Sequence, residues 1–284
     1  MSIRLLTVLV LCTLATAGLR AAETAIQPFS PGVVSYTYRE ELKADVPGTL
    51  DKIKALGITD IEFSNLFGKT AAELRALLDA RGLACSSFGV GYDDLLKKTE
   101  LVATQAKTLG AHYIRVAYLP NRQPFTLELA QKTATEFNAI GKQLREQYGL
   151  TFCYHNHGYE FVKHGDGTLY DLLVASTEPA DVSYELDIMW AFVPGADPAA
   201  LLEKHGSRIK LLHLKDLKKG VPHDPAGKTA SDNDVALGSG QIDIPAVVRA
   251  AQKAGVAHWY IEDESTRTAT QVPETLRYLK GLSP

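Results

Sequence analysis

The chain has 284 residues, of which 45% are hydrophobic and 22% are charged, and its formal net charge is −3. This composition is typical of a globular protein and excludes a chain that is disordered throughout. The small negative charge argues against a broad nucleic-acid-binding surface, which needs an excess of Lys and Arg. The length suits either two average domains or one large α/β domain.

The first 22 residues have the three-part pattern of a secretory signal peptide. A positive charge at Arg4 precedes an apolar run over 5–17, and small residues follow at Ala21 and Ala22. The alternative is an N-terminal membrane anchor, but the run is shorter than the about 20 residues of a membrane span. We therefore expect residues 1–22 to be cleaved and 23–284 to be exported, to the periplasm, without stable membrane insertion.

Eight apolar or β-branched segments are expected to form strands, and segments with helical periodicity separate them. The expected strands are 33–38, 60–65, 84–90, 113–119, 151–157, 182–189, 208–215 and 258–264. Several helical segments stop at a glycine shortly before the next strand, as helices with a left-handed cap do: Gly57, Gly82, Gly110 and Gly255. Strands alternating with helices indicate right-handed βαβ units and a parallel sheet.

Eight such units predict a single-domain (β/α)8 TIM barrel over residues 23–284. The alternative is an open, doubly wound sheet. That fold normally carries a glycine-rich nucleotide-binding turn after its first strand, and no such turn follows the first expected strand here. No break in composition indicates a second domain.

The last four expected strands end in pairs of ionisable residues. The pairs are His155 and His157, Glu185 and Asp187, His213 and Lys215, and Glu262 and Glu264. Residues two apart on a strand point to the same side, and barrel enzymes carry their chemistry at the C-terminal ends of the strands. One polar strand end is explained by solvation alone, but four consecutive ones indicate a shared site.

Burying this many charges without a counter-ion is costly. A divalent cation supplies the missing charge, and carboxylates together with imidazole suit Mn²⁺, Zn²⁺, Co²⁺ or Mg²⁺. We therefore predict one divalent metal ion as the cofactor.

The combination of "YHNHGYEF", "ELDIMWAFVPGADP", "HLKD", "GSGQID" and "YIEDE" resembles the sugar phosphate isomerase/epimerase family, the xylose-isomerase-like TIM barrels. The resemblance covers nearly the whole chain after the signal peptide. It implies one divalent metal held by Asp187, His213 and Glu262 together with a residue from the fifth strand. For that residue we expect Glu160, with His155 as the alternative.

The resemblance also implies roles for the remaining polar residues and a carbohydrate as the partner. We expect catalytic roles for His155, His157, Lys215 and Glu262, and substrate contacts for Glu62, Asn156, Trp190, His223 and Glu264. Packing is the alternative for Glu62 and Trp190. His223 lies in the long connection 216–240, which we expect to act as a lid over the substrate, with a disordered surface insertion as the alternative. Pairing of two barrels through surface helices stays open.

The expected reaction is sugar isomerisation or epimerisation. A base removes a proton next to a carbonyl, and the metal stabilises the enediolate that forms. The alternative is a lyase or dehydratase, in which the same enolate expels a β-substituent from an inosose or a 3-keto-glycoside. A second alternative is a barrel that binds a sugar without turning it over.

The signal peptide generates the first testable prediction. We expect the mature protein to begin near Ala22 and to be recovered from the exported fraction, because the N-terminus carries all three parts of an export signal. Intact-mass measurement and N-terminal sequencing of protein from the producing cells check this. An exported protein that still begins at Met1 would contradict cleavage.

Overall fold

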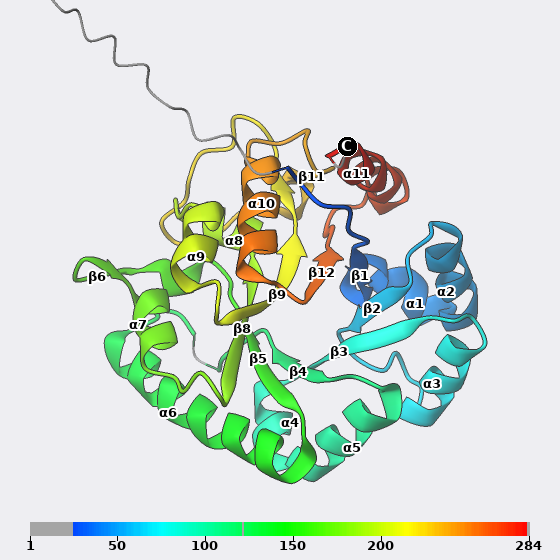
Figure 1. Cartoon of the computed structure of the whole chain (residues 1–284), viewed down its shortest axis with the longest axis horizontal. Helices are drawn as coiled ribbons and strands as arrows, with labels where there is room; N and C mark the ends of the chain where they lie inside the picture. Colours follow the sequence, from blue (N-terminus) through cyan, green and yellow to red (C-terminus); the bar gives the residue numbers. More distant parts are fainter. Residues whose placement is uncertain (1–24, 121, 283–284) are drawn as a thin grey trace, which may run out of the picture.

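The computed structural model describes residues 25–120 and 122–282. Within them eight parallel strands close into a barrel in the order β1-β12-β9-β8-β5-β4-β3-β2, and helices surround it (Figure 1). The barrel strands are β1 Gly32–Val34, β2 Asp60–Phe63, β3 Ala84–Val90, β4 Tyr113–Val116, β5 Thr151–His155, β8 Val182–Asp187, β9 Ile209–Leu214 and β12 His258–Ile261. The predicted (β/α)8 TIM barrel is confirmed. The predicted signal peptide, 1–22, lies outside the described residues.

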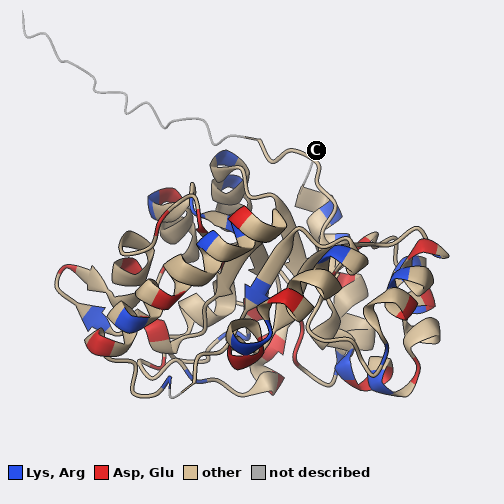
Figure 2. Cartoon of the chain, turned by 90° about the horizontal axis from the view of Figure 1, so that it is seen from below, with Lys and Arg blue, Asp and Glu red and all other residues tan. Residues whose placement is uncertain are grey.

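Helices follow the strands in the order that the sequence pattern predicts. They are α1 Arg39–Ala44, α2 Val46–Ala55, α3 Ala71–Asp79, α4 Tyr92–Lys97, α5 Thr99–Leu109, α6 Leu127–Gln143, α7 Leu169–Ala175, α8 Ile188–Phe192, α9 Pro198–His205, α10 Ile244–Ala254 and α11 Thr268–Leu282. All four glycines predicted near helix ends have a positive φ: Gly57, Gly82, Gly110 and Gly255. No helix of the described part is both long and apolar enough to cross a membrane. Lys and Arg are interspersed with Asp and Glu over the helices (Figure 2).

The first strand is shorter than predicted. β1 ends at Val34, and the next four residues form the 3-10 helix η1, Ser35–Tyr38. The Ser35 hydroxyl accepts a hydrogen bond of 2.7 Å from the backbone N–H of Ser64. This side-chain bond takes the place of further strand pairing, so the chain turns and Tyr36 comes to line a cavity.

The interior of the barrel changes from apolar to charged along the strands. A separate buried cluster comprises Val34, Tyr113, Cys153, Leu211 and Tyr260. Arg115, His155, His213 and Glu262 each lie two positions after a member of this cluster and therefore point to the same interior. Glu185 and Asp187 of β8 lie opposite Leu211 and His213 of β9. The opposite faces of the strands carry apolar residues, such as Leu186, Leu212 and Ile261, that belong to the main core between strands and helices.

The connection 216–240 is folded onto the barrel. It forms a short antiparallel hairpin of β10, Asp216–Leu217, and β11, Asp234–Val235. At its end the Asp216 carboxylate accepts hydrogen bonds from the backbone N–H groups of Gly238, Gly240 and Ile242, at 3.0, 3.0 and 3.1 Å. In the middle, Gly227 packs directly against Gly158, which follows β5, so closely that a Cβ on either residue would overlap the other's backbone.

This glycine contact generates a stability prediction. Gly220 and Gly227 both have a positive φ, at 83° and 67°, but only Gly227 is crowded. We expect Gly220→Ala to lower the free energy of unfolding by about 1–2 kcal/mol, the usual cost of a left-handed L-residue. Gly227→Ala should cost roughly 1–3 kcal/mol more because of the overlap. Urea denaturation followed by circular dichroism checks this, and equal losses in the two variants would contradict the packing role.

Candidate metal centre and active site

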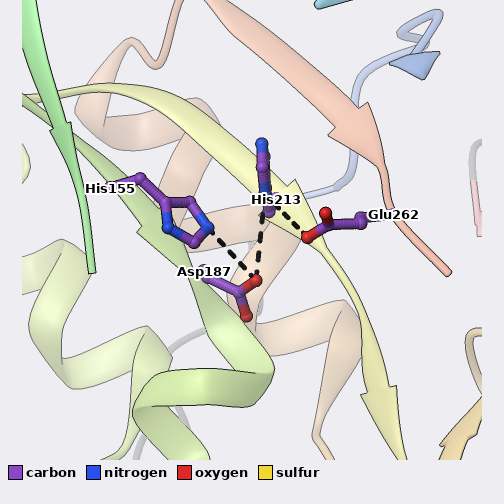
Figure 3. A group of neighbouring side chains, drawn as sticks. All are labelled: His155, Asp187, His213 and Glu262. Carbon is purple, nitrogen blue, oxygen red and sulfur yellow. Dashed lines mark hydrogen bonds and ion pairs between the residues drawn. The ribbon is translucent and has the colours of Figure 1, made fainter. Parts of the chain in front are cut away.

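Four buried side chains converge at the C-terminal ends of the strands (Figure 3). They are His155, Asp187, His213 and Glu262, and one ligand atom from each lies within 4.8 Å of the others. Nε2 of His155 is 3.4 Å from Oδ2 of Asp187. Nδ1 of His213 is 3.0 Å from Oε2 of Glu262 and 3.8 Å from Oδ2 of Asp187. Strand pairing places Asp187 opposite His213, so the register itself assembles much of the group.

The donor set fits a divalent cation. Both ring nitrogens of His155 and Oδ2 of Asp187 are buried without a hydrogen-bond partner, and such groups are normally satisfied. Burial by itself would lower the pKa of the His213 imidazole, but the carboxylates of Glu185 and Glu262 raise it well above its usual value. The carboxylates around His213 therefore favour a positive charge beside them. Two imidazoles and two carboxylates are typical ligands for Zn²⁺ and related ions.

A second layer of charge lies on the other side of His213. Nε2 of His213 is 3.0 Å from Oε1 of Glu62 and 3.2 Å from Oε2 of Glu185. The Arg115 guanidinium donates to Glu62 at 2.6 and 3.0 Å, and its Nε lies 3.3 Å from Glu185. Burial and the Glu62 charge raise the pKa of Glu185 to about 7. The predicted substrate contact of Glu62 is therefore replaced by ion pairs with Arg115 and His213 inside the barrel.

Lys215 is buried beneath the cavity wall rather than exposed in it. Its Nζ donates to the Glu264 carboxylate and lies 5.3 Å from the centre of the Trp190 ring. Its other partners are Glu262, Asp187 and Asp234, at 3.3, 3.7 and 3.8 Å. Burial opposes its charge, but the surrounding carboxylates, Glu262 first, raise the pKa of Lys215 well above its usual value. A lysine held in this way positions Glu262 and Glu264.

A cavity of about 270 Å³ opens above the four converging side chains. Its polar walls include His155, His157, His213, Glu262 and Glu264, and its aromatic walls are Tyr36, Tyr118 and Trp190. Burial is the main cause that lowers the pKa of His157 well below its usual value, and the neighbouring His155 is the second cause. The imidazole of His157 is therefore neutral at neutral pH. His157, predicted as catalytic, and Trp190, predicted to bind substrate, both line this cavity.

Glu160, the expected first ligand, lies elsewhere. Its carboxylate accepts hydrogen bonds from the Tyr154 hydroxyl at 2.6 Å and from the backbone N–H of His157 at 3.1 Å. Burial raises its pKa to about 7 despite these bonds. Among the described residues Glu160 belongs to neither group of converging ligand atoms. The chain turns at Gly158, which directs Glu160 back under the fifth strand, and the alternative, His155, occupies the position.

Asn156 links two strands instead of facing the cavity. Its side-chain oxygen accepts from the backbone N–H of Asp187 at 3.0 Å, and its amide donates to the carbonyl of Asp187 at 3.3 Å. The side chain is fully buried. The expected substrate contact is thus replaced by a clamp that fixes the backbone of Asp187.

His223 also lies outside the cavity. Its ring shares a hydrogen bond of 2.9 Å with the carbonyl of Phe192 and lines a separate pocket near α9. No residue of 216–240 lines the cavity above the converging side chains. The structure therefore does not bring His223 together with the other predicted site residues, and its substrate contact stays a prediction.

The sequence patterns above do not single out Arg115, Tyr36, Tyr118 or Asp234. Arg115 is the one charge in the apolar strand β4, and its even spacing from Tyr113 is a signal that it points into the barrel. Tyr36 and Tyr118 fall inside the expected strands 33–38 and 113–119, but in the structure they follow the ends of β1 and β4. Asp234 reaches the site only through the fold of a long loop, which leaves no periodic signal.

The fold and the site together define a (β/α)8 barrel with a metal-type centre at the C-terminal end of its strands. The family description that matches residues 50–282 is the xylose isomerase-like TIM barrel. The chain belongs to this family.

Relatives and solved structures agree with that assignment. The chain is 24% identical over 229 residues to the inosose dehydratase of Geobacillus kaustophilus, covering 70% of this chain and 73% of the relative. It is 24% identical over 257 residues to that of Lacticaseibacillus casei, covering 79% and 83%. A sugar phosphate isomerase/epimerase from Parabacteroides distasonis has a TM-score of 0.72 at 23% identity, covering 88% and 97%. An IolI protein with a bound zinc atom has a TM-score of 0.69 at 16% identity, covering 89% and 96%.

The position of the fifth-strand ligand generates a metal-binding prediction. We expect His155→Ala to weaken Zn²⁺ or Mn²⁺ binding at least about tenfold, since even the loss of a residue that only orients a ligand costs that much. Glu160→Gln keeps an oxygen acceptor for Tyr154 and should retain the metal. Titration calorimetry and metal analysis of the dialysed proteins check this, with Asp187→Asn as a second variant expected to lose the metal. Loss of metal from Glu160→Gln alone would reverse the assignment.

Proposed function

We propose that this protein is a metal-dependent lyase. It removes the proton beside the ketone of a keto-sugar and expels an oxygen substituent from the next carbon. The observation that carries this proposal is that His157 lies beside the four converging side chains. We call these four, His155, Asp187, His213 and Glu262, the metal-type group. The imidazole of His157 lies 4.9 Å from that of His155, ring centre to ring centre, and both line one cavity.

His155, Asp187, His213 and Glu262 would hold the ion. When bound there, a divalent cation supplies a Lewis acid that stabilises negative charge on the carbonyl oxygen while the neighbouring carbon loses its proton. The zinc atom of the IolI structure supports a divalent ion. Asn156 and Lys215 hold these donors in place through the backbone of Asp187 and the carboxylate of Glu262.

His157 is the residue that moves the proton. Its Nδ1 is buried without a hydrogen-bond partner, and its ring is packed between Tyr118 and Trp190, at 4.1 and 5.6 Å. Such an imidazole can accept the proton from carbon and deliver it to the departing oxygen, so the elimination needs no second acid. Glu264, held by Lys215, is placed on the same cavity wall to bind a sugar hydroxyl.

The donor set favours elimination over epimerisation. Epimerisation through an enediolate needs a proton acceptor on each face of the sugar, and the carboxylate of a fifth-strand glutamate would provide one. This chain has His155 at that place, so Glu262, the one carboxylate of the group that lines the cavity, would have to serve both as metal ligand and as second proton acceptor, whereas elimination needs His157 alone. The inosose dehydratases among the relatives also support elimination.

Isomerisation or epimerisation of a sugar is the second candidate. Glu262 lines the cavity and can return a proton to the carbon from which His157 removes it. The similarity of the fold to a sugar phosphate isomerase/epimerase supports this candidate at the level of the family. A barrel that only binds sugar is disfavoured by an unpartnered imidazole beside a metal-type group.

We also propose that the protein acts outside the cytoplasm. The support is the N-terminal pattern over residues 1–22. An exported enzyme meets free or oxidised saccharides more readily than sugar phosphates, which agrees with a keto-sugar substrate.

The reaction generates the fourth prediction. Metal-loaded protein should convert an inosose or a 3-keto-glucoside into an unsaturated ketone, with release of water or alcohol, which ultraviolet absorbance and NMR detect. His157→Gln should lower kcat by about 10²–10⁴-fold, the usual contribution of a general base, while its metal content stays unchanged. The control is His164→Gln, an exposed residue of β6, Lys163–His164, which should keep full activity.

Each alternative has its own product. A saturated product that has lost no water or alcohol, and that carries a solvent deuterium at the carbon beside the carbonyl when the reaction is run in D2O, would replace the lyase by an isomerase or epimerase. Saturable binding of these compounds without any product would indicate a binding barrel.

A further inference from the structure

Two tyrosines are exposed at the mouth of the cavity. Tyr36 and Tyr118 are 41% and 52% exposed, and both line the cavity above the metal-type group. The other large apolar side chains with comparable exposure in the described chain are Leu96, Leu101 and Val162, and none of these lines the cavity. Exposed aromatic rings gathered at a pocket mark a binding surface.

Both rings are held in place by arginines. The Arg39 guanidinium lies 4.6 Å from the centre of the Tyr36 ring, and that of Arg122 lies 4.5 Å from the centre of the Tyr118 ring. Arg39 is itself fixed, because it donates to the carbonyls of Tyr36 and Glu264 at 3.0 and 3.1 Å. A cation over one face leaves the rest of each ring available and reduces the entropy lost when a ligand binds.

The mouth is continuous with the reacting centre. The Tyr118 ring is 4.1 Å from that of His157, which is 4.9 Å from that of His155. The cavity itself measures about 270 Å³, which is slightly below the range of about 300–1,000 Å³ for pockets that enclose a drug-sized ligand. A cavity of this size encloses one sugar-sized ring, and the exposed parts of Tyr36 and Tyr118 at its mouth offer a surface for a group attached to that ring.

We propose that Tyr36 and Tyr118 form a second subsite for a ring joined through oxygen to the reacting sugar. The substrate is then a keto-glycoside with a cyclic leaving group, not a free keto-sugar. This inference rests on the lyase function proposed above. A single-ring substrate such as an inosose would occupy the cavity and leave the solvent-exposed outer parts of both tyrosines uncovered.

The reaction balances without a further reactant. The C–H bond beside the ketone breaks, and its proton passes to His157. The electron pair forms a C=C bond as the glycosidic C–O bond breaks, and the proton on His157 passes to the departing oxygen. The products are an unsaturated keto-sugar and a cyclic alcohol, and nothing is oxidised or reduced overall.

The test compares a methyl with a cyclohexyl 3-keto-glucoside on the metal-loaded protein, because the two alcohols are similar leaving groups. We expect kcat/KM to be at least tenfold higher for the cyclohexyl compound. The Tyr36→Ala/Tyr118→Ala variant should reduce this preference to less than twofold, and the ratio is the readout because the loss of Tyr118, which packs on His157, affects both compounds alike. Tyr36→Phe/Tyr118→Phe should keep the preference, and Leu101→Ala, which removes an exposed side chain of α5 away from the cavity, should have no effect.

A binding arm separates this inference from the proposed reaction. Unoxidised cyclohexyl glucoside, which lacks the ketone, should show saturation-transfer NMR contacts through its cyclohexyl ring in wild type and lose them in the double alanine variant. If no keto-glucoside is eliminated but this pattern is found, the lyase proposal fails and the ring subsite stands. Elimination of the methyl and cyclohexyl compounds at equal rates, or a cyclohexyl preference that survives the double alanine change, would overturn the subsite.

Discussion

The site depends on His213, whose imidazole joins two layers of buried charge. Nε2 faces Glu62 and Glu185, and Nδ1 faces Glu262 and Asp187, all within 3.8 Å. Carboxylates at Nε2 favour a proton on that nitrogen, which leaves the Nδ1 lone pair directed at the metal-type group. The ring orientation and its basicity are thus fixed from inside the barrel.

Arg115 offsets the repulsion between the buried carboxylates of Glu62 and Glu185. It neutralises Glu62 and part of the charge of Glu185, and without it these carboxylates would face each other in a region from which water is excluded. Above it Lys215 performs the same task for Glu262, Glu264 and Asp187. These two fixed cations number fewer than the carboxylates around them, and the space between Asp187, Glu262 and the two imidazoles is where additional positive charge is most favoured.

Strand periodicity was enough to predict which polar residues share the barrel interior. The paired residues at the ends of β5, β8, β9 and β12 do lie there, because residues two apart on a strand must point to the same side. The sequence could not separate His155 from Glu160, since both come after the same apolar run and the choice depends on the turn at Gly158. It also could not place His223, whose position depends on the contact between Gly227 and Gly158.

The loop after β9 supports the cavity wall instead of covering the cavity. Its hairpin returns Asp234 to the barrel, where Oδ2 accepts from the backbone N–H of Glu264 at 2.9 Å and lies 3.8 Å from Nζ of Lys215. Arg267 holds this turn through the carbonyls of Asp232 and Asp234, at 3.0 Å each. Because no part of 216–240 lines the cavity, a ligand need not displace this loop to enter. A ligand that enters the cavity passes Tyr36 and Tyr118 at its mouth. These side chains are therefore the ones that can select what is attached to the reacting sugar.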